Sequence, residues 1–202
     1  IDEGDMYSAA MVANSKARVQ RLGYFEEVDI SAKPADQPHR VSMSVDVVEK
    51  PTGSFSFGAG FGSVDGFIIS GSVRQDNLFG TGQSAGAREK LTNYGDRTDL
   101  TYRLPWLLGT PLKGDLGLFR EYRDQFGYKL DQAGFTTGIE RTLLPVPFKD
   151  LYRLRLGLRY QLAWIRQYDV SPSLETGGAD AIVPGTQIVA KISPAVTMDY
   201  RD

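Results

Sequence analysis

The chain has 202 residues, of which 41% are hydrophobic and 24% charged, and its formal net charge at pH 7 is -2. Because the charges nearly balance and no long basic run occurs, we do not expect nucleic acid as a partner. The absence of cysteine excludes disulfide frameworks and thiolate metal sites. With a single histidine, His39, placed between a proline and an arginine in an expected loop, we expect neither a common zinc centre nor a Ser-His-Asp triad. No run of 18 apolar residues is present that could form a membrane-spanning helix.

The first predicted element is a helix over residues 8–22, where apolar residues recur along one stripe. Asp5 or Ser8 can cap the start of this helix. Gly23 can adopt the left-handed conformation that ends it.

Two strands are predicted next, at residues 28–32 and 40–49. The loop between them carries two prolines and His39, and we expect it to be exposed, with His39 solvated. One helix and one hairpin can bury only a thin layer of apolar surface. Residues 1–51 are therefore expected to form the C-terminal part of a larger α+β module.

The segment that follows, "GSFSFGAGFG", alternates strictly and predicts a strand. One face carries small residues and the other carries mainly phenylalanine. The small residues are Ser54, Ser56, Gly58, Gly60 and Gly62, and the opposite face is formed by Phe55, Phe57, Ala59 and Phe61. Glycine in a strand marks a bend or close packing, or else it weakens the pairing so that the strand can open, and the residues alone leave both interpretations open.

The rest of the chain predicts about eight strands and no helix. We expect the strands at residues 54–62, 67–75, 83–91, 97–104, 114–123, 132–141, 152–165 and 187–201. Between them, "NLFGTGQ", "LPWLLGTPLK" and "LLPVPFKD" are compact, whereas the loop over residues 167–186 is long and polar. Strands with one apolar and one polar face, with short turns at one end only, are typical of transmembrane β-barrels. The predicted fold class is mainly β, an antiparallel transmembrane β-barrel preceded by part of an α+β module.

We find no catalytic constellation in the sequence. "GAGFGS" lacks the spacing and the helix of a dinucleotide fingerprint, and "FGTGQ" lacks the lysine of a phosphate loop. A carboxylate pair on the inner face remains an alternative, although we expect these acids to be paired with arginines that solvate a barrel interior. The acids are Asp99, Asp115, Glu121 and Glu140, and the arginines are Arg103, Arg120, Arg123, Arg141 and Arg159. The prediction is a protein that is not an enzyme and needs no cofactor or metal.

Three stretches resemble a known family. "SKARVQRLGYFEEVDI" (residues 15–30) looks like the end of the second helix and the next strand of a POTRA module. "VDVVEKPTGSFSFGAGFGSVDGF" (residues 45–67) resembles the junction between the last POTRA module and the first barrel strand in the BamA family of outer-membrane β-barrel assembly factors. "QDNLFGTGQ" (residues 75–83) is similar to the first periplasmic turn of that barrel.

The resemblance implies several POTRA modules followed by a sixteen-stranded barrel. Residues 1–51 would be the end of the last module and residues 52–202 the N-terminal half of the barrel. The junction would consist of Glu49, Lys50, Pro51, Thr52 and Gly53. Because an open half-barrel would leave unpaired backbone groups in lipid, we expect the chain to be part of a longer protein.

The resemblance also implies a function and a location. The protein would lie in the bacterial outer membrane with its POTRA part in the periplasm. There its first barrel strand would open and offer its edge to an incoming strand. The implied partners are unfolded outer-membrane protein clients, periplasmic lipoproteins of an assembly complex, and outer-membrane lipid. The alternatives are a POTRA-barrel translocator of the two-partner secretion type and a passive porin, although a porin would lack the helix and hairpin.

Overall fold

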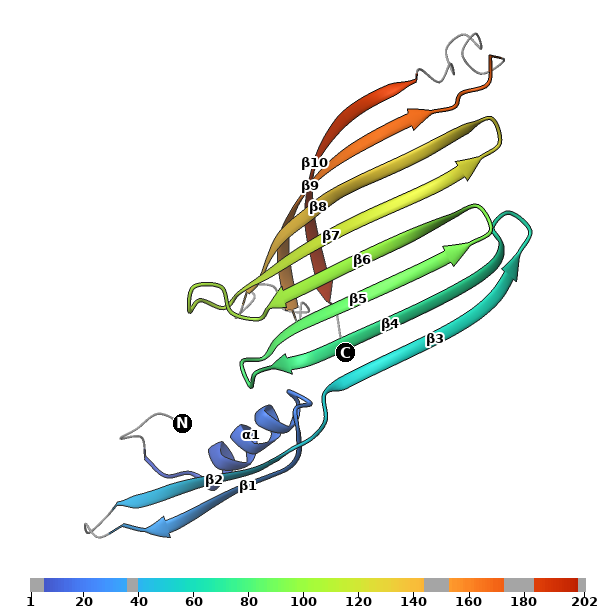
Figure 1. The fold of residues 1–202 in the computed structure, drawn as a ribbon. Helices are drawn as coiled ribbons and strands as arrows, with labels where there is room; N and C mark the ends of the chain where they lie inside the picture. The colour runs from blue at the N-terminus through green and yellow to red at the C-terminus, as the bar shows by residue number, and fades with distance from the viewer. Residues whose placement is uncertain (1–5, 36–39, 144–152, 173–183, 200–202) are drawn as a thin grey trace. The chain divides into compact units, whose positions relative to one another are not determined.

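The structure is a computed structural model that describes residues 6–35, 40–143, 153–172 and 184–199 (Figure 1). The chain forms two compact units, Ile1–Thr52 and Gly53–Asp202. Asp5, His39, most of the predicted turn at residues 143–150, most of the loop at residues 167–186 and the chain end at residues 200–202 lie outside the described residues.

The first unit contains one helix and one hairpin. Its elements are α1 (Ala9–Gln20), β1 (Phe25–Pro34) and β2 (Val41–Glu49), and the two strands pair antiparallel. Ser8 holds the N-cap position with an extended backbone but makes no side-chain capping bond. Gly23 has φ of +76°, the left-handed conformation predicted for the residue that ends the helix.

Little of the first unit is buried. Helix α1 packs against β1 but has no buried residue of its own, and Lys16 Nζ contacts Asp29 Oδ1 at 3.2 Å between the two elements. Val28 on β1, paired with Val47 on β2, is only 1% exposed. The described part of this unit therefore buries the thin layer that one helix and one hairpin can provide.

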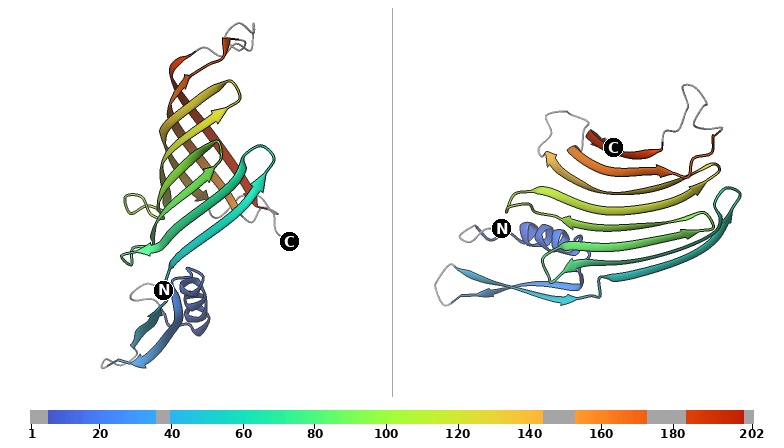
Figure 2. Two further views of the ribbon diagram at one scale, coloured as in Figure 1. Left: turned by 45° about the vertical axis from the view of Figure 1, so that its right-hand side comes forward. Right: turned by 45° about the horizontal axis from the view of Figure 1, so that its top comes forward.

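The second unit is a single antiparallel sheet in which neighbours along the chain are neighbours in the sheet, in the order β10-β9-β8-β7-β6-β5-β4-β3. Its eight strands are β3 (Gly53–Gly62), β4 (Gly66–Leu78), β5 (Gln83–Thr92), β6 (Gly95–Leu104), β7 (Leu112–Gln125), β8 (Tyr128–Leu143), β9 (Arg153–Tyr168) and β10 (Gly185–Asp199). Figure 2 shows that the sheet is curved across its width. The predicted fold class, mainly β with about eight strands in this part, is confirmed.

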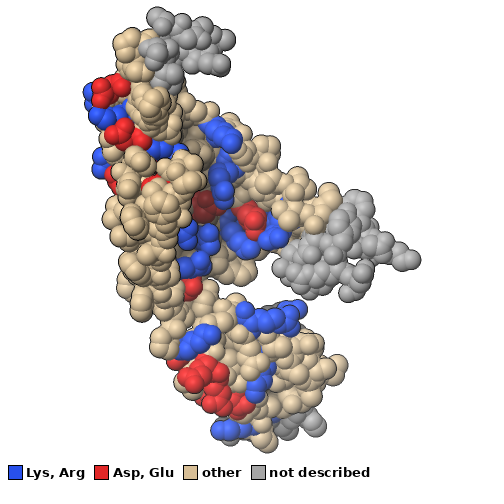
Figure 3. Space-filling view, turned by 90° about the vertical axis from the view of Figure 1, so that its right-hand side faces the viewer, with Lys and Arg blue, Asp and Glu red and all other residues tan. Residues whose placement is uncertain are grey.

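The two faces of this sheet differ sharply. The cross-strand register places apolar side chains on one face, which we call the apolar face; examples are Phe57, Val73, Leu100, Leu118, Leu158 and Ile192. The opposite face, called the polar face, carries Arg88, Arg97, Asp99, Glu121 and Arg159. Figure 3 shows lysine and arginine side chains gathered in the hollow of the curved sheet.

The apolar face of the sheet is left without cover by the described residues. Phe57 is 74% exposed, and Leu118, Leu158 and Ile192 are also exposed. Exposing so broad an apolar surface to water is unfavourable, whereas contact with the hydrocarbon core of a membrane is favourable. No helix in the described ranges is long and apolar enough to cross a membrane.

Candidate functional site

The strand singled out by the sequence, β3, forms one edge of the sheet. Among the described residues it pairs only with β4, from Gly53 opposite Gln75 to Gly62 opposite Gly66. Residues 53–61 are all exposed. One side of β3 therefore presents backbone N–H and C=O groups that no described strand satisfies. The other edge of the sheet is β10.

The phenylalanines of β3 lie on the apolar face, as predicted. Phe55 is 87% exposed and stands opposite Val73, another residue of that face. At the far end of the strand, the rings of Phe61 and Phe67 meet edge to face with 5.4 Å between their centroids. This geometry is favourable for aromatic pairs and secures the β3–β4 turn.

On the polar face, β3 and β4 are joined by small side chains. The hydroxyls of Ser56 and Ser72 share a hydrogen bond of 2.7 Å, while Gly58 stands opposite Ser70. Cross-strand side-chain pairs contribute roughly 0.2–1 kcal/mol each, and glycine contributes no such contact. Side chains on the polar face therefore contribute little to the attachment of β3, and the backbone hydrogen bonds to β4 supply most of it.

The structure tests one interpretation of the β3 glycines, that of close packing. A Cβ added at Gly60 would meet nothing within 4 Å. At Gly62 the nearest atom would be the Cδ1 of Ile68, at 3.5 Å. At Gly58 the Cβ would lie 3.3 Å from the hydroxyl of Ser70, which can rotate away. Close packing therefore does not explain why glycine occupies these three positions.

Elsewhere in the sheet, glycine does allow close packing. A Cβ at Gly134 on β8 would stand 2.2 Å from the carbonyl oxygen of Leu162 and 2.8 Å from Cζ of Phe119. The ring of Phe119 covers Gly134, and the Arg97 guanidinium lies 5.7 Å from the ring centroid. Phe119 lies on the polar face, as its position in the alternation predicts. The polar face accommodates this ring because it packs between a glycine and a cation.

The polar face carries a network of charges centred on Glu121 of β7, which is 5% exposed. Arg97 binds Asp99 through two nitrogens at 2.9 Å each and donates to Glu121 at 2.8 Å. Gln132 donates to Glu121 at 2.6 Å, and Arg123 also donates to it. Three hydrogen-bond donors offset the cost of removing the Glu121 carboxylate from water. Because these donors come from three strands, the network holds β6, β7 and β8 together.

The predicted pairing of acids with arginines is partly right. Arg123 contacts Glu121, and Arg159 lies 3.8 Å from Asp115, across the space above Gly138. Two cations that the sequence analysis did not name complete the set: Arg97 holds Asp99, and Lys113 lies 3.2 Å from Glu140.

Arg120 and Arg141 were wrongly assigned to this set. Both lie on the apolar face, because each is one residue out of phase with the polar positions of its strand. Arg120 instead lies 3.7 Å from Asp131, which is on the same face.

The four acids from which a catalytic carboxylate pair could have come are Asp99, Asp115, Glu121 and Glu140, and each lies beside a cation. Across the described residues, no group of three or more His, Cys, Asp or Glu side chains could hold a metal ion. What the described residues offer is the strand β3 at an edge of the described sheet, with few side-chain contacts on its polar side.

Two family models match the chain. The Omp85 superfamily domain matches residues 77–202, which is more than half of the chain. The POTRA model, described as a surface antigen variable number repeat, matches residues 1–50.

Several relatives are similar over most of the chain. The outer membrane protein assembly factor BamA of Neisseria meningitidis serogroup B is 28% identical over 173 residues, covering 84% of this chain and 22% of that protein. BamA of Neorickettsia risticii is 26% identical over 205 residues, covering 100% of this chain and 26% of that protein. The chain thus spans about a quarter of the length of these curated relatives.

A solved structure shows the same fold. The crystal structure of BamA from Haemophilus ducreyi lacking POTRA domains 1-3 matches with a TM-score of 0.72 and 22% identity, covering 100% of this chain and 40% of that chain. The resemblance inferred from sequence is confirmed, and so is the location in the outer membrane with the POTRA part in the periplasm. The chain belongs to the Omp85 superfamily.

Proposed function

We propose that this chain is part of an outer-membrane protein assembly factor that inserts and folds β-barrel clients through the edge of β3. The observation that carries the proposal is the loose attachment of β3. On its polar face the Ser56–Ser72 hydrogen bond joins it to β4, and glycine occupies three positions where a Cβ would come no closer than 3.9 Å to a backbone atom. The relatives named as assembly factors support the general activity. The role of the β3 edge is implied by the family resemblance of residues 45–67 and forms the finer part of the proposal.

In this mechanism, an incoming client strand pairs with the backbone of β3. Main-chain hydrogen bonds supply the affinity, so the client needs alternating side chains but no fixed sequence. A strand of ten residues such as Gly53–Gly62 matches the length that crosses a membrane, about 9–11 residues when tilted. The phenylalanines of β3 would extend the apolar surface on which the client folds.

The glycines of β3 act as the gate in this proposal. They are Gly58, Gly60 and Gly62, and they form the gate together with their neighbours Ser54, Phe55, Ser56, Phe57, Ala59 and Phe61. Because a Cβ fits at the three glycines without a backbone clash, their advantage is not steric. Glycine lowers the stability of a strand by roughly 0.5–1 kcal/mol per position relative to alanine, so three of them favour opening.

The same proposal assigns the chain's two parts. Residues 1–51 would be the end of the last POTRA module, and residues 52–202 the first half of the barrel. Glu49 ends β2 and Gly53 begins β3, so the proposed junction of Glu49, Lys50, Pro51, Thr52 and Gly53 is the short connection between the two units. Partners would be unfolded clients, periplasmic lipoproteins and outer-membrane lipid. No covalent step is needed, and the proposal therefore involves no enzyme activity.

The test is reconstitution of the full-length protein in liposomes with an unfolded barrel client. Folding of the client is read from its protease resistance and its shift on unheated gels. Liposomes with the protein should fold the client several times faster than empty liposomes, and a peptide that pairs with β3 should slow the reaction. Ion conductance without any acceleration of client folding would instead indicate a passive pore and contradict the proposal.

A further inference from the structure

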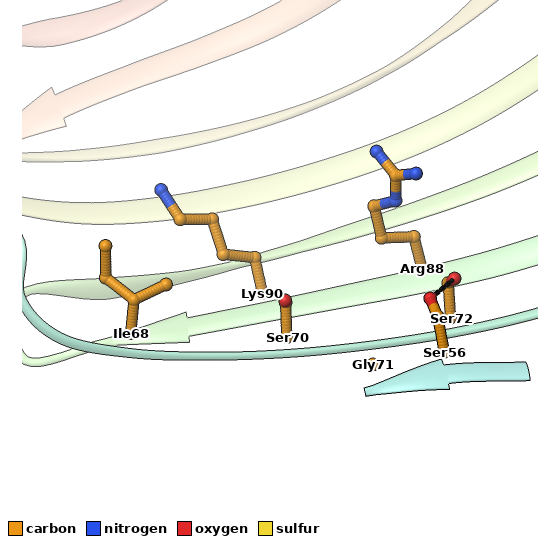
Figure 4. A pocket seen from close by; sticks show the side chains of 7 residues that line it. All are labelled: Ser56, Ile68, Ser70, Gly71, Ser72, Arg88 and Lys90. Atoms are coloured by element: carbon orange, nitrogen blue, oxygen red, sulfur yellow. Dashed lines mark hydrogen bonds between the residues drawn. The ribbon is translucent and has the colours of Figure 1, made fainter. Parts of the chain in front are cut away.

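A polar recess lies on the polar face of the sheet, directly behind β3 (Figure 4). Its volume is about 260 Å³. Three strands line it: β3 with Ser56, β4 with Ile68, Ser70 and Ser72, and β5 with Arg88 and Lys90. Figure 4 shows the two long cationic side chains rising from β5 on the same side of the sheet as the serine hydroxyls.

Arg88 is the unusual member of this recess. Its cross-strand neighbour on β6 is Asp99, but both carboxylate oxygens of Asp99 are bound by Arg97 at 2.9 Å. Lys90 is already paired with Asp65 at 3.0 Å. Within the described residues, Arg88 therefore has no ion-pair partner, whereas Lys90 and Arg97 on the same face do.

The hydroxyls supply the remaining donors. Ser56 and Ser72 share one hydrogen bond, and since only one of the two hydroxyls donates it, the other keeps its own proton for a further acceptor. Ser70 adds a third hydroxyl to the lining. A guanidinium with adjacent hydroxyl donors is suited to an oxygen anion.

The charge of the recess selects among anions. Arg88 and Lys90 bring two positive charges and Asp65 removes one, which leaves a single net positive charge. A carboxylate matches one charge and the planar fork of one arginine, whereas a phosphate monoester carries about two negative charges at neutral pH. The recess lies on the polar face, opposite the face that contacts lipid, so a peptide can reach it and a membrane lipid cannot.

We propose that this recess binds the carboxylate of an acidic side chain on a peptide segment that lies along the polar face of the sheet. The Arg88 guanidinium holds the carboxylate, and the hydroxyl of Ser70 and the remaining proton of the Ser56–Ser72 pair complete its hydrogen bonds. A volume of about 260 Å³ holds an acidic side chain with the adjoining backbone. Because Ser56 belongs to β3 and Arg88 to β5, the bound carboxylate links the edge strand to the second strand inward.

This link has a consequence that rests on the proposed function. An occupied recess adds contacts between β3 and its neighbours, so it favours the paired state of β3 and disfavours the open state that a client needs. An acidic segment would then restrain opening until it leaves. The binding itself does not depend on any client and can be tested without one.

The binding test uses full-length protein in lipid nanodiscs, labelled at isoleucine methyl groups for NMR. Ile68 lines the recess and reports binding, while Ile192 on the apolar face of β10 serves as an internal reference. The probe is a blocked pentapeptide with one central glutamate, compared with its glutamine counterpart and with inorganic phosphate. We expect the glutamate peptide to shift the Ile68 signal, and the glutamine peptide and phosphate to leave it unchanged at the same concentration.

Variants identify the residue responsible. Arg88→Gln should weaken binding of the glutamate peptide about tenfold or more, the loss expected for a charge-assisted pair. Arg88→Lys keeps the charge but loses the planar fork, so its affinity for the glutamate peptide should lie between those of the wild-type protein and Arg88→Gln. The matched control is Arg103→Gln, which removes a cation from the same face outside the recess and should leave binding unchanged.

Three outcomes would overturn the proposal: equal shifts from the glutamate and glutamine peptides, equal weakening by Arg88→Gln and Arg103→Gln, or tighter binding of phosphate than of the peptide. Hydrogen exchange of the β3 amides, measured without a client, tests the link to the edge strand. Exchange should slow in wild-type protein with the glutamate peptide and stay unchanged in the Arg88→Gln variant. These measurements omit the client, so a negative result would contradict the recess proposal without bearing on the assembly function. Failure of client folding would contradict the assembly function without bearing on the recess.

Discussion

Replacing Gly60 with valine is the most direct test of the idea that β3 is kept loosely paired. A Cβ at Gly60 meets nothing within 4 Å, so the folded sheet can accept the larger side chain. Valine is favoured over glycine in strands by about 1 kcal/mol. Since about 1.4 kcal/mol corresponds to a tenfold change in an equilibrium, opening of β3 should become about fivefold rarer.

Three measurements check this expectation in the full-length protein. Hydrogen exchange at the β3 amides should slow by about fivefold, while the unfolding free energy should stay the same or rise by about 1 kcal/mol. Client folding in liposomes should slow although the protein is no less stable. The triple replacement of Gly58, Gly60 and Gly62 with valine should impair client folding further and still spare the barrel. If stability and client folding fall in parallel, the glycines serve the structure and the gating argument is wrong.

Gly134→Val is the matched control for this experiment. At Gly134 an added Cβ would stand 2.2 Å from the carbonyl oxygen of Leu162, so the same substitution forces the strands apart. It should lower the unfolding free energy by about 2 kcal/mol or more, the range seen for overpacking. Loss of client folding in this variant should then follow from loss of folded protein.

Three further predictions concern stability, and the first two are measured by urea or thermal unfolding. Glu121→Gln removes the carboxylate that three donors share and should destabilise the sheet by about 2–3 kcal/mol, so a neutral result would show that the network is solvated. Gly138→Ala places a Cβ 2.6 Å from an Asp115 carboxylate oxygen and should displace Asp115 from Arg159. Because that ion pair is partly exposed, the unfolding free energy should fall by less than about 1 kcal/mol, and a larger loss would point to a backbone clash. Val28→Ala should cost the first unit about 2 kcal/mol, measured as faster proteolysis of residues 6–50, with an unchanged rate arguing that this layer does not stabilise the unit.

The strands were predictable because alternation is a local property. The clearest segment was predicted at residues 152–165 and is Arg153–Tyr168 in the structure. The predictions were too short where strand ends carry polar residues: β8 was expected at residues 132–141 and runs from Tyr128 to Leu143. Backbone pairing with β7 and β9 extends it, and this pairing leaves no apolar pattern in the sequence.

The contacts on the polar face depend on register, which a single sequence does not reveal. Arg97 meets Glu121 because these residues stand opposite each other on β6 and β7, although 24 positions separate them along the chain. Counting from Phe119 would have placed Arg120 correctly, because neighbouring residues of a strand point to opposite faces. The recess behind β3 had a detectable signal in the serines at positions 56, 70 and 72, but only the β3–β4 register brings them together.

The chemistry of β3 also affects how this protein must be handled. Soluble proteins guard their edge strands with lysine, proline or a bulge, and Gly53–Gly62 contains no lysine or proline and pairs with β4 without a register shift. Two copies that expose this strand could join edge to edge into a continuous sheet. An isolated fragment should therefore dimerise or aggregate through β3 in detergent, and a lysine introduced at Ala59 should suppress this association.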